Sequence, residues 1–120
     1  MVYLYIFIGG GLGSLVRYII TRFSNQMISI EFPLGTFISN MLACLLLVVL
    51  VASFSSKQAE YEWVQPLLII GFCGGFSTFS TFSNETFNLF ESGHSALAIL
   101  NILISVSVGI GLIFFLRSRA

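Results

Sequence analysis

The residues best suited to do chemistry in this chain stand in one short stretch, GFCGGFSTFSTF, at residues 71–82. Two of its phenylalanines, Phe79 and Phe82, are interleaved with the hydroxyl residues Ser80 and Thr81. The edge of a phenyl ring is electropositive and a hydroxyl group donates hydrogen bonds, so both can favour an anion without holding it too tightly to leave. The stretch therefore predicts a pathway for a small anion. The alternative is that the rings pack against lipid or core and the hydroxyls bond main-chain carbonyls.

Polar side chains also occur in two other apolar segments. Thr36 and Asn40 are four residues apart, as are Asn101 and Ser105, so each pair shares one face of a helix. An asparagine in an apolar segment is costly unless it finds hydrogen-bond partners. We therefore expect these residues either to bond neighbouring helices or to line the same pathway.

A cation, Arg17, stands inside the first apolar segment after a run of small residues that includes Gly9 and Gly13. Small residues spaced by four allow another helix to approach closely. A guanidinium near the end of a membrane helix either reaches the lipid headgroups or faces a water-filled vestibule, where it attracts anions. Both readings remain open from the sequence.

Composition indicates that the elements carrying these residues are membrane helices. Of the 120 residues, 57% are hydrophobic and 8% are charged, whereas a soluble domain carries about 25% charged residues. Apolar blocks of about 20 residues are long enough to cross the hydrocarbon core of a bilayer. We predict an all-α membrane protein in which residues 1–120 form a single domain of four spans. The spans cover residues 3–23, 35–54, 64–90 and 96–116.

The third span is expected to be a broken helix, because Gly74 and Gly75 weaken it. The prediction is a helix broken at this glycine pair, with the irregular part within residues 74–78. Free carbonyls at membrane depth are tolerated only inside protein or beside a cavity, and they can ligate a cation.

Other function classes fit the sequence less well. We find no nucleophile–base pair that would indicate an enzyme, and a net charge of zero gives no reason to expect nucleic acid. A small dual-topology multidrug exporter would need a carboxylate within a span, whereas Glu85 and Glu91 are expected near an interface. A subunit that only scaffolds a larger membrane complex is the remaining alternative. Positive charges favour cytoplasmic termini so weakly that insertion in both orientations is compatible with them.

Three motifs in order, GGGLGSLVRY, PLGTFISN and GFCGGFSTFSTFSNE, resemble the Fluc (CrcB) family of fluoride channels. The resemblance extends along nearly the whole chain. It implies a passive fluoride-selective channel that exports fluoride and gives fluoride resistance. It also implies an antiparallel, dual-topology dimer with two pores. The resemblance places the protein in the bacterial plasma (inner) membrane, as a multi-pass protein in contact with lipid.

The resemblance assigns roles by motif position. A structural sodium ion is expected at the dimer centre, held by the backbone carbonyls of Gly74 and Ser77, and Arg17 matches the arginine of a vestibule. Carbonyl oxygens suit a hard cation. The expected pore residues are Thr36, Asn40, Phe79, Ser80, Thr81, Phe82, Asn101 and Ser105.

Two departures from the family pattern bear on assembly. Ala43 and Cys44 stand where the family usually has Gly-Ser, and Asn101 stands where it often has a tyrosine that contributes to the pore. A homodimer is the main expectation. The departure at Asn101 leaves open a heterodimer with a paralogous chain that supplies part of the pathway.

Overall fold

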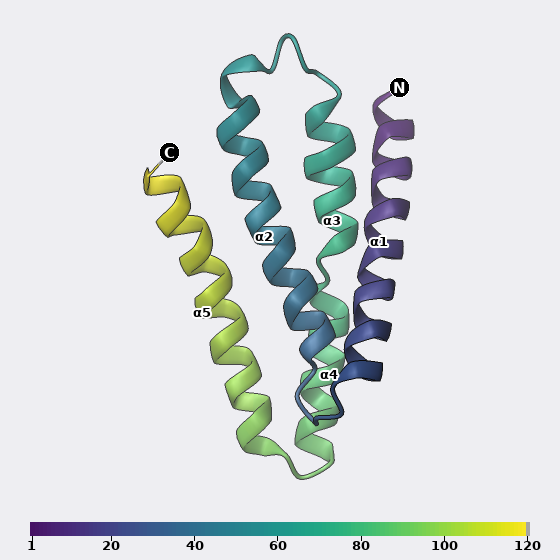
Figure 1. Cartoon of the computed structure of the whole chain (residues 1–120), viewed down its shortest axis with the longest axis vertical. Helices are drawn as coiled ribbons and strands as arrows, with labels where there is room; N and C mark the ends of the chain where they lie inside the picture. Colours follow the sequence, from purple (N-terminus) through teal and green to yellow (C-terminus); the bar gives the residue numbers. More distant parts are fainter. Residues whose placement is uncertain (120) are drawn as a thin grey trace.

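The computed structural model describes residues 1–119, and every regular element among them is a helix (Figure 1). Two long helices, α1 and α2, come first, and a third long helix, α5, ends the chain. Between them lies a span built from consecutive shorter pieces. The elements are α1 (Val2–Met27), α2 (Leu34–Phe54), the 3₁₀ turn η1 (Ser55–Lys57), the π-helix η2 (Gln65–Cys73), α3 (Gly74–Phe76), α4 (Phe79–Glu91) and α5 (Ser95–Arg119).

Four helical segments are long and apolar enough to cross a membrane, as the apolar blocks predicted. In Figure 1 the start of α1 and the end of α5 lie at the same end of the bundle, as an even number of crossings requires. The four segments are Val2–Met27, Leu34–Lys57, Gln65–Glu91 and Ser95–Ser118.

The two halves of the third span pack against different neighbours. The upper half, η2 and α3, lies along α1, whereas α4 packs against α5, and α2 contacts both halves. The interruption between the halves is visible near mid-height of Figure 1. The first half therefore pairs with α1 and the second half pairs with α5, while α2 passes the junction between them.

Glycines let α1 and the upper half of the third span approach closely. A β-carbon on Gly9 would collide with the Leu67 carbonyl oxygen, and one on Gly13 with that of Phe72. In the opposite direction, a β-carbon on Gly75 would collide with the Gly10 carbonyl oxygen. The contact is thus made backbone to backbone, as small residues permit between membrane helices.

The third span is interrupted within the predicted residues 74–78, but after the glycine pair and not at it. Gly74 has helical dihedral angles (φ −64°, ψ −38°), so the expected break at Gly74-Gly75 is wrong in its position. The extended residues are Ser77 (φ −86°, ψ 158°) and Thr78 (φ −152°, ψ 122°). The physical reason is that Gly75 is needed for close contact with α1, whereas the main chain of Thr78 is drawn out of the helix by another partner, Asn40.

Candidate anion pathway

The interruption is held by the side chain of one residue on α2. The Thr78 amide donates to Asn40 Oδ1 at 2.8 Å, and Asn40 Nδ2 donates back to the Thr78 carbonyl oxygen at 3.3 Å. The amide of Asn40 thus serves both polar groups of a main-chain residue that has left its helix. Such pairing is what buried main-chain groups require. Asn40 makes the interhelical hydrogen bonds that the sequence allowed for.

Thr78 also begins the second half of the span. Its side-chain Oγ1 accepts from the Thr81 amide at 3.2 Å, which makes Thr78 the N-cap of α4. The Ser80 hydroxyl lies 3.4 Å from the same oxygen. Threonine at this position satisfies an amide that the first turn of a helix leaves without an intrahelical partner. Ser80 and Thr81 therefore stand at the positive end of the α4 dipole.

A groove of about 330 Å³ opens beside this junction, between α2, α4 and α5. The rings of Phe79 and Phe82 lie in it with centroids 6.0 Å apart and planes tilted by 41°. Of the predicted pore residues, it brings together Asn40, Phe79, Phe82 and Ser105. Its lining is Asn40, Met41, Cys44, Ser77, Thr78, Phe79, Phe82, Ser105, Val106, Gly109, Ile110 and Ile113. We call it the pathway groove.

The remaining predicted pore residues lie outside the lining of this groove. Thr36 is buried, and its side chain lies beside the carboxylate of Glu85. Ser80 is exposed and Thr81 is half-buried at the start of α4. The side chain of Asn101 is only 1% exposed and faces α4 within the bundle.

The Arg17 guanidinium is held at the end of the upper half of the third span. Its Nε–H donates to the Gly75 carbonyl oxygen at 3.1 Å. The carbonyl end of a helix carries partial negative charge, which a cation stabilises. Arg17 is half-buried. Its guanidinium therefore stabilises the interruption as well as placing positive charge close to it.

Two main-chain carbonyls at the interruption lose their helical donors. The Thr78 amide would serve the Gly74 carbonyl in an unbroken helix but donates to Asn40 instead, and the Thr81 amide likewise goes to the side chain of Thr78 and not to the Ser77 carbonyl. Gly74 and Ser77 both border a second groove of about 390 Å³ between α2 and the third span. Within residues 1–119 no cluster of three or more His, Cys, Asp or Glu side chains could hold a metal ion. The groups that Gly74 and Ser77 offer at this groove are main-chain carbonyl oxygens.

Sequence reasoning missed two polar residues of this region. Thr78 was not singled out, although a threonine immediately before a helical run is an N-cap signal. Glu85 was expected near an interface, and it does line a groove with Glu31 and Pro33 of the connection before α2. What was not predicted is that its Oε1 atom is buried and has no hydrogen-bond partner within the described part of the chain. The signal was its spacing, because Glu85 lies four residues after Thr81 and so continues the polar face of α4.

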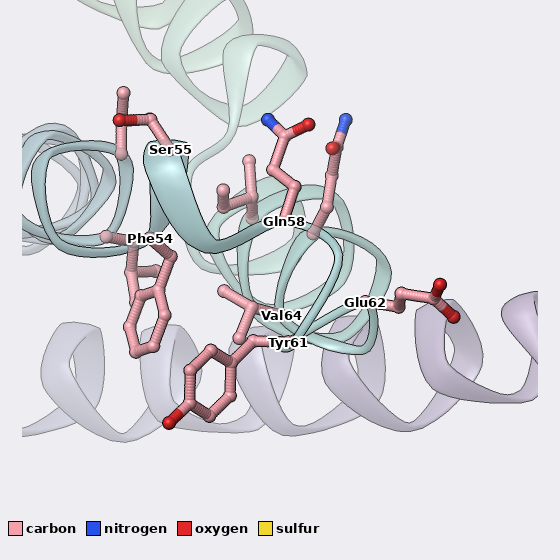
Figure 2. Close-up of a pocket in the computed structure, with 10 residues that line it drawn as sticks. Phe54, Ser55, Gln58, Tyr61, Glu62 and Val64 are labelled. Carbon is pink, nitrogen blue, oxygen red and sulfur yellow. The ribbon is translucent and has the colours of Figure 1, made fainter.

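A separate small cavity of about 80 Å³ lies at the other end of α2, next to the connection into η2 (Figure 2). The rings of Phe54 and Tyr61 meet edge to face at its border, with centroids 5.3 Å apart. Figure 2 shows Glu62 directed away from Tyr61. Since Phe54 follows Asn40 by about 21 Å of helix, this cavity is distant from the interruption and shares no lining residue with the pathway groove.

Comparison with known proteins gives one consistent result. The family model described as CrcB-like protein, Camphor Resistance (CrcB), matches residues 4–116. The chain is 40% identical over 106 residues to a Flavobacterium psychrophilum protein, covering 88% of this chain and 86% of the relative. It is 41% identical over 106 residues to a Coxiella burnetii protein, with the same coverage of 88% and 86%. It is 44% identical over 112 residues to a Pyrococcus abyssi protein, covering 92% and 89%. All three relatives are named fluoride-specific ion channel FluC.

Proposed function

Because this chain belongs to the CrcB family, we propose that it is a passive channel that lets fluoride leave the cell. The observation that carries the proposal is the pathway groove, where Asn40, Phe79 and Phe82 meet beside an interrupted membrane helix. The relatives are ion channels by name, in keeping with a transport protein and not an enzyme.

The chemistry of the groove suits an anion that must move on. Ring edges of Phe79 and Phe82 offer weak positive potential, and the amides at the start of α4 add partial positive charge. Arg17 raises the local concentration of anions through its full charge. No single group binds the ion tightly, as conduction requires.

Export needs no energy source other than the membrane potential. Hydrogen fluoride enters from acidic surroundings and dissociates in the cytosol, where fluoride is trapped as an anion. A membrane potential contributes about 2.3 kcal/mol per charge per 100 mV and drives the anion outward. The proposed location is the bacterial inner membrane, with the apolar outer faces in contact with lipid.

The proposed active form is an antiparallel homodimer. The Phe79 side chain is 78% exposed in the single chain, so the pathway groove is open on the side where the proposed second copy would supply a wall. The weak charge bias of the loops allows both orientations. A paralogous chain could supply the same wall in a heterodimer, which the experiment below distinguishes.

The carbonyls of Gly74 and Ser77 fit the sodium ion expected at the dimer centre. They lack their helical donors, as described above, and Gly74 is exposed on the face of the second groove. Two such carbonyls from each subunit would hold the ion, which when bound supplies positive charge that joins the subunits.

Fluoride efflux from liposomes that contain only this purified chain tests the proposal. A fluoride electrode records the flux, and chloride efflux from the same liposomes is the control. Rapid fluoride-selective flux that is insensitive to a proton gradient supports a homodimeric channel. Flux that appears only on co-expression with a paralogue identifies a heterodimer. Strict proton dependence, or cation transport that is lost in Glu85→Gln, would identify an exporter and overturn the proposal.

A further inference from the structure

Two walls of the pathway groove are joined from behind by a chain of hydrogen bonds. The walls are Phe82 on α4 and Ser105 on α5. The Ser105 hydroxyl donates to Asn101 Oδ1 at 3.2 Å, and Asn101 Nδ2 donates to Thr86 Oγ1 at 2.9 Å. The Thr86 hydroxyl then donates to the Phe82 carbonyl oxygen at 2.7 Å. The chain thus begins and ends at residues that border the groove.

The two inner members of this chain are buried between the helices. Asn101 is 1% exposed and Thr86 is 6% exposed, and neither lines the pathway groove. Each lies one helical turn from a groove residue of its own helix, Asn101 before Ser105 and Thr86 after Phe82. The bond between them therefore fixes how α4 and α5 are aligned along their length. A buried polar network that is satisfied favours one packing over its alternatives.

We propose that Asn101 and Thr86 are positioning residues that set the separation of Phe82 and Ser105, and thereby the width of the pathway, without touching the ion. The inference rests on the proposed fluoride conduction. It differs from the role expected of Asn101 from the family pattern, because the side chain faces α4 and not the groove. A wider pathway would also discriminate less between fluoride and the larger chloride ion.

Variants of Thr86 separate the hydroxyl from the shape of the side chain. Thr86→Val keeps the shape and removes the hydroxyl, whereas Thr86→Ser keeps the hydroxyl. We expect fluoride efflux per folded protein to fall about tenfold in Thr86→Val, a size typical of coupling within one hydrogen-bond network. We expect the ratio of fluoride to chloride efflux to fall as well. Thr86→Ser should stay near the unmodified rate, and so should Ser107→Ala, which removes an exposed hydroxyl from α5.

The double variant Thr86→Val/Asn101→Leu distinguishes positioning from stability. Removing both partners leaves no unpaired amide between the helices, so the thermal stability lost in Thr86→Val should largely return. Efflux should stay about tenfold below the unmodified rate, because the polar link between α4 and α5 is still absent. Efflux that recovers together with stability would overturn the inference. If Thr86→Val fails to fold, unmodified flux and selectivity in the double variant would overturn it equally.

The unmodified chain, assayed in the same liposomes, separates this inference from the proposed function. Absence of fluoride flux from the unmodified chain, alone and with a paralogue, would defeat the proposed function and this inference with it. Normal flux from the unmodified chain, together with normal flux from the double variant, would defeat this inference alone.

Discussion

The side-chain amide of Asn40 on α2 pairs with both main-chain polar groups of Thr78 in the third span. It accepts from the Thr78 amide at 2.8 Å and donates to the Thr78 carbonyl at 3.3 Å. A side chain of α2 thereby holds open a helix of another span, within the groove that also holds the two phenylalanines. Asn40 thus stabilises the interruption of the third span by hydrogen bonds and is also a polar group on the proposed ion path.

Two variants of Asn40 separate these roles. Asn40→Leu leaves the Thr78 amide unpaired and should destabilise the protein by about 1–3 kcal/mol. Asn40→Asp keeps an acceptor for that amide, so it should retain more stability, yet its carboxylate repels an anion in the groove. We expect both to lower fluoride efflux by roughly a hundredfold, the rate equivalent of about 3 kcal/mol. Thermal unfolding in detergent and liposome efflux measure the two effects, with the exposed Asn88→Asp as control. Undiminished flux in Asn40→Asp would remove Asn40 from the ion path.

Phe79 should matter for conduction far more than for folding. Its ring is 78% exposed in the single chain, so Phe79→Ile removes little buried surface but takes away an aromatic edge from the groove. We expect fluoride efflux to fall by about tenfold or more, which corresponds to a rise of about 1.4 kcal/mol in the barrier to conduction. The unfolding temperature should not change. Phe114→Ile is the matched control, because Phe114 is 76% exposed on α5 and lies outside the groove. Equal losses in the two variants would mean that ring position is unimportant.

The packing between α1 and the third span predicts opposite effects on stability for two glycine-to-alanine substitutions, one at Gly75 and one at Gly11. Gly75→Ala would drive a methyl group into the Gly10 carbonyl and should cost about 1–3 kcal/mol through overpacking. Gly11→Ala meets open space and should be neutral or raise stability by up to about 1 kcal/mol through helix propensity. Thermal unfolding of both variants, run side by side, checks the pair. Similar melting temperatures would show that α1 can move away without penalty.

Removal of sodium should weaken the proposed dimer. Because the proposed ligands are main-chain oxygens, no side-chain substitution removes them, and the ion itself must be exchanged. We expect purification in N-methylglucamine in place of sodium to reduce both the dimer fraction and fluoride efflux, and readdition of sodium to restore them. Size-exclusion chromatography and liposome efflux are the two measurements. A stable, fully conducting dimer after exhaustive sodium removal would contradict the assignment of Gly74 and Ser77.

The spans were predictable from sequence because apolar blocks of membrane length have few alternatives to a helix. Motif and spacing singled out eight candidate pore residues, and four of them, Asn40, Phe79, Phe82 and Ser105, line one groove. The exact interruption was not predictable from propensity. Glycine weakens a helix by propensity, but Gly75 stays helical. Its lack of a β-carbon serves the close contact with Gly10 on α1 instead.

Asn101 illustrates a second limit. Spacing predicted that Asn101 shares a face of its helix with Ser105, and the hydrogen bond between the two side chains confirms this. Which neighbour that face meets depends on the packing of α4 against α5, and a periodic pattern does not specify it. The Thr86 hydroxyl that receives the Asn101 amide stands fifteen residues earlier in a different helix.

The division of the third span between two packing partners has a consequence for the order in which the chain is built. When η2 and α3 enter the membrane, their partner α1 precedes them in the chain, so the glycine contacts can form at once. The next segment, α4, is made before its partner α5, so Thr86 must wait for Asn101. The phenylalanines of the groove would be set in place only by the last helix to emerge.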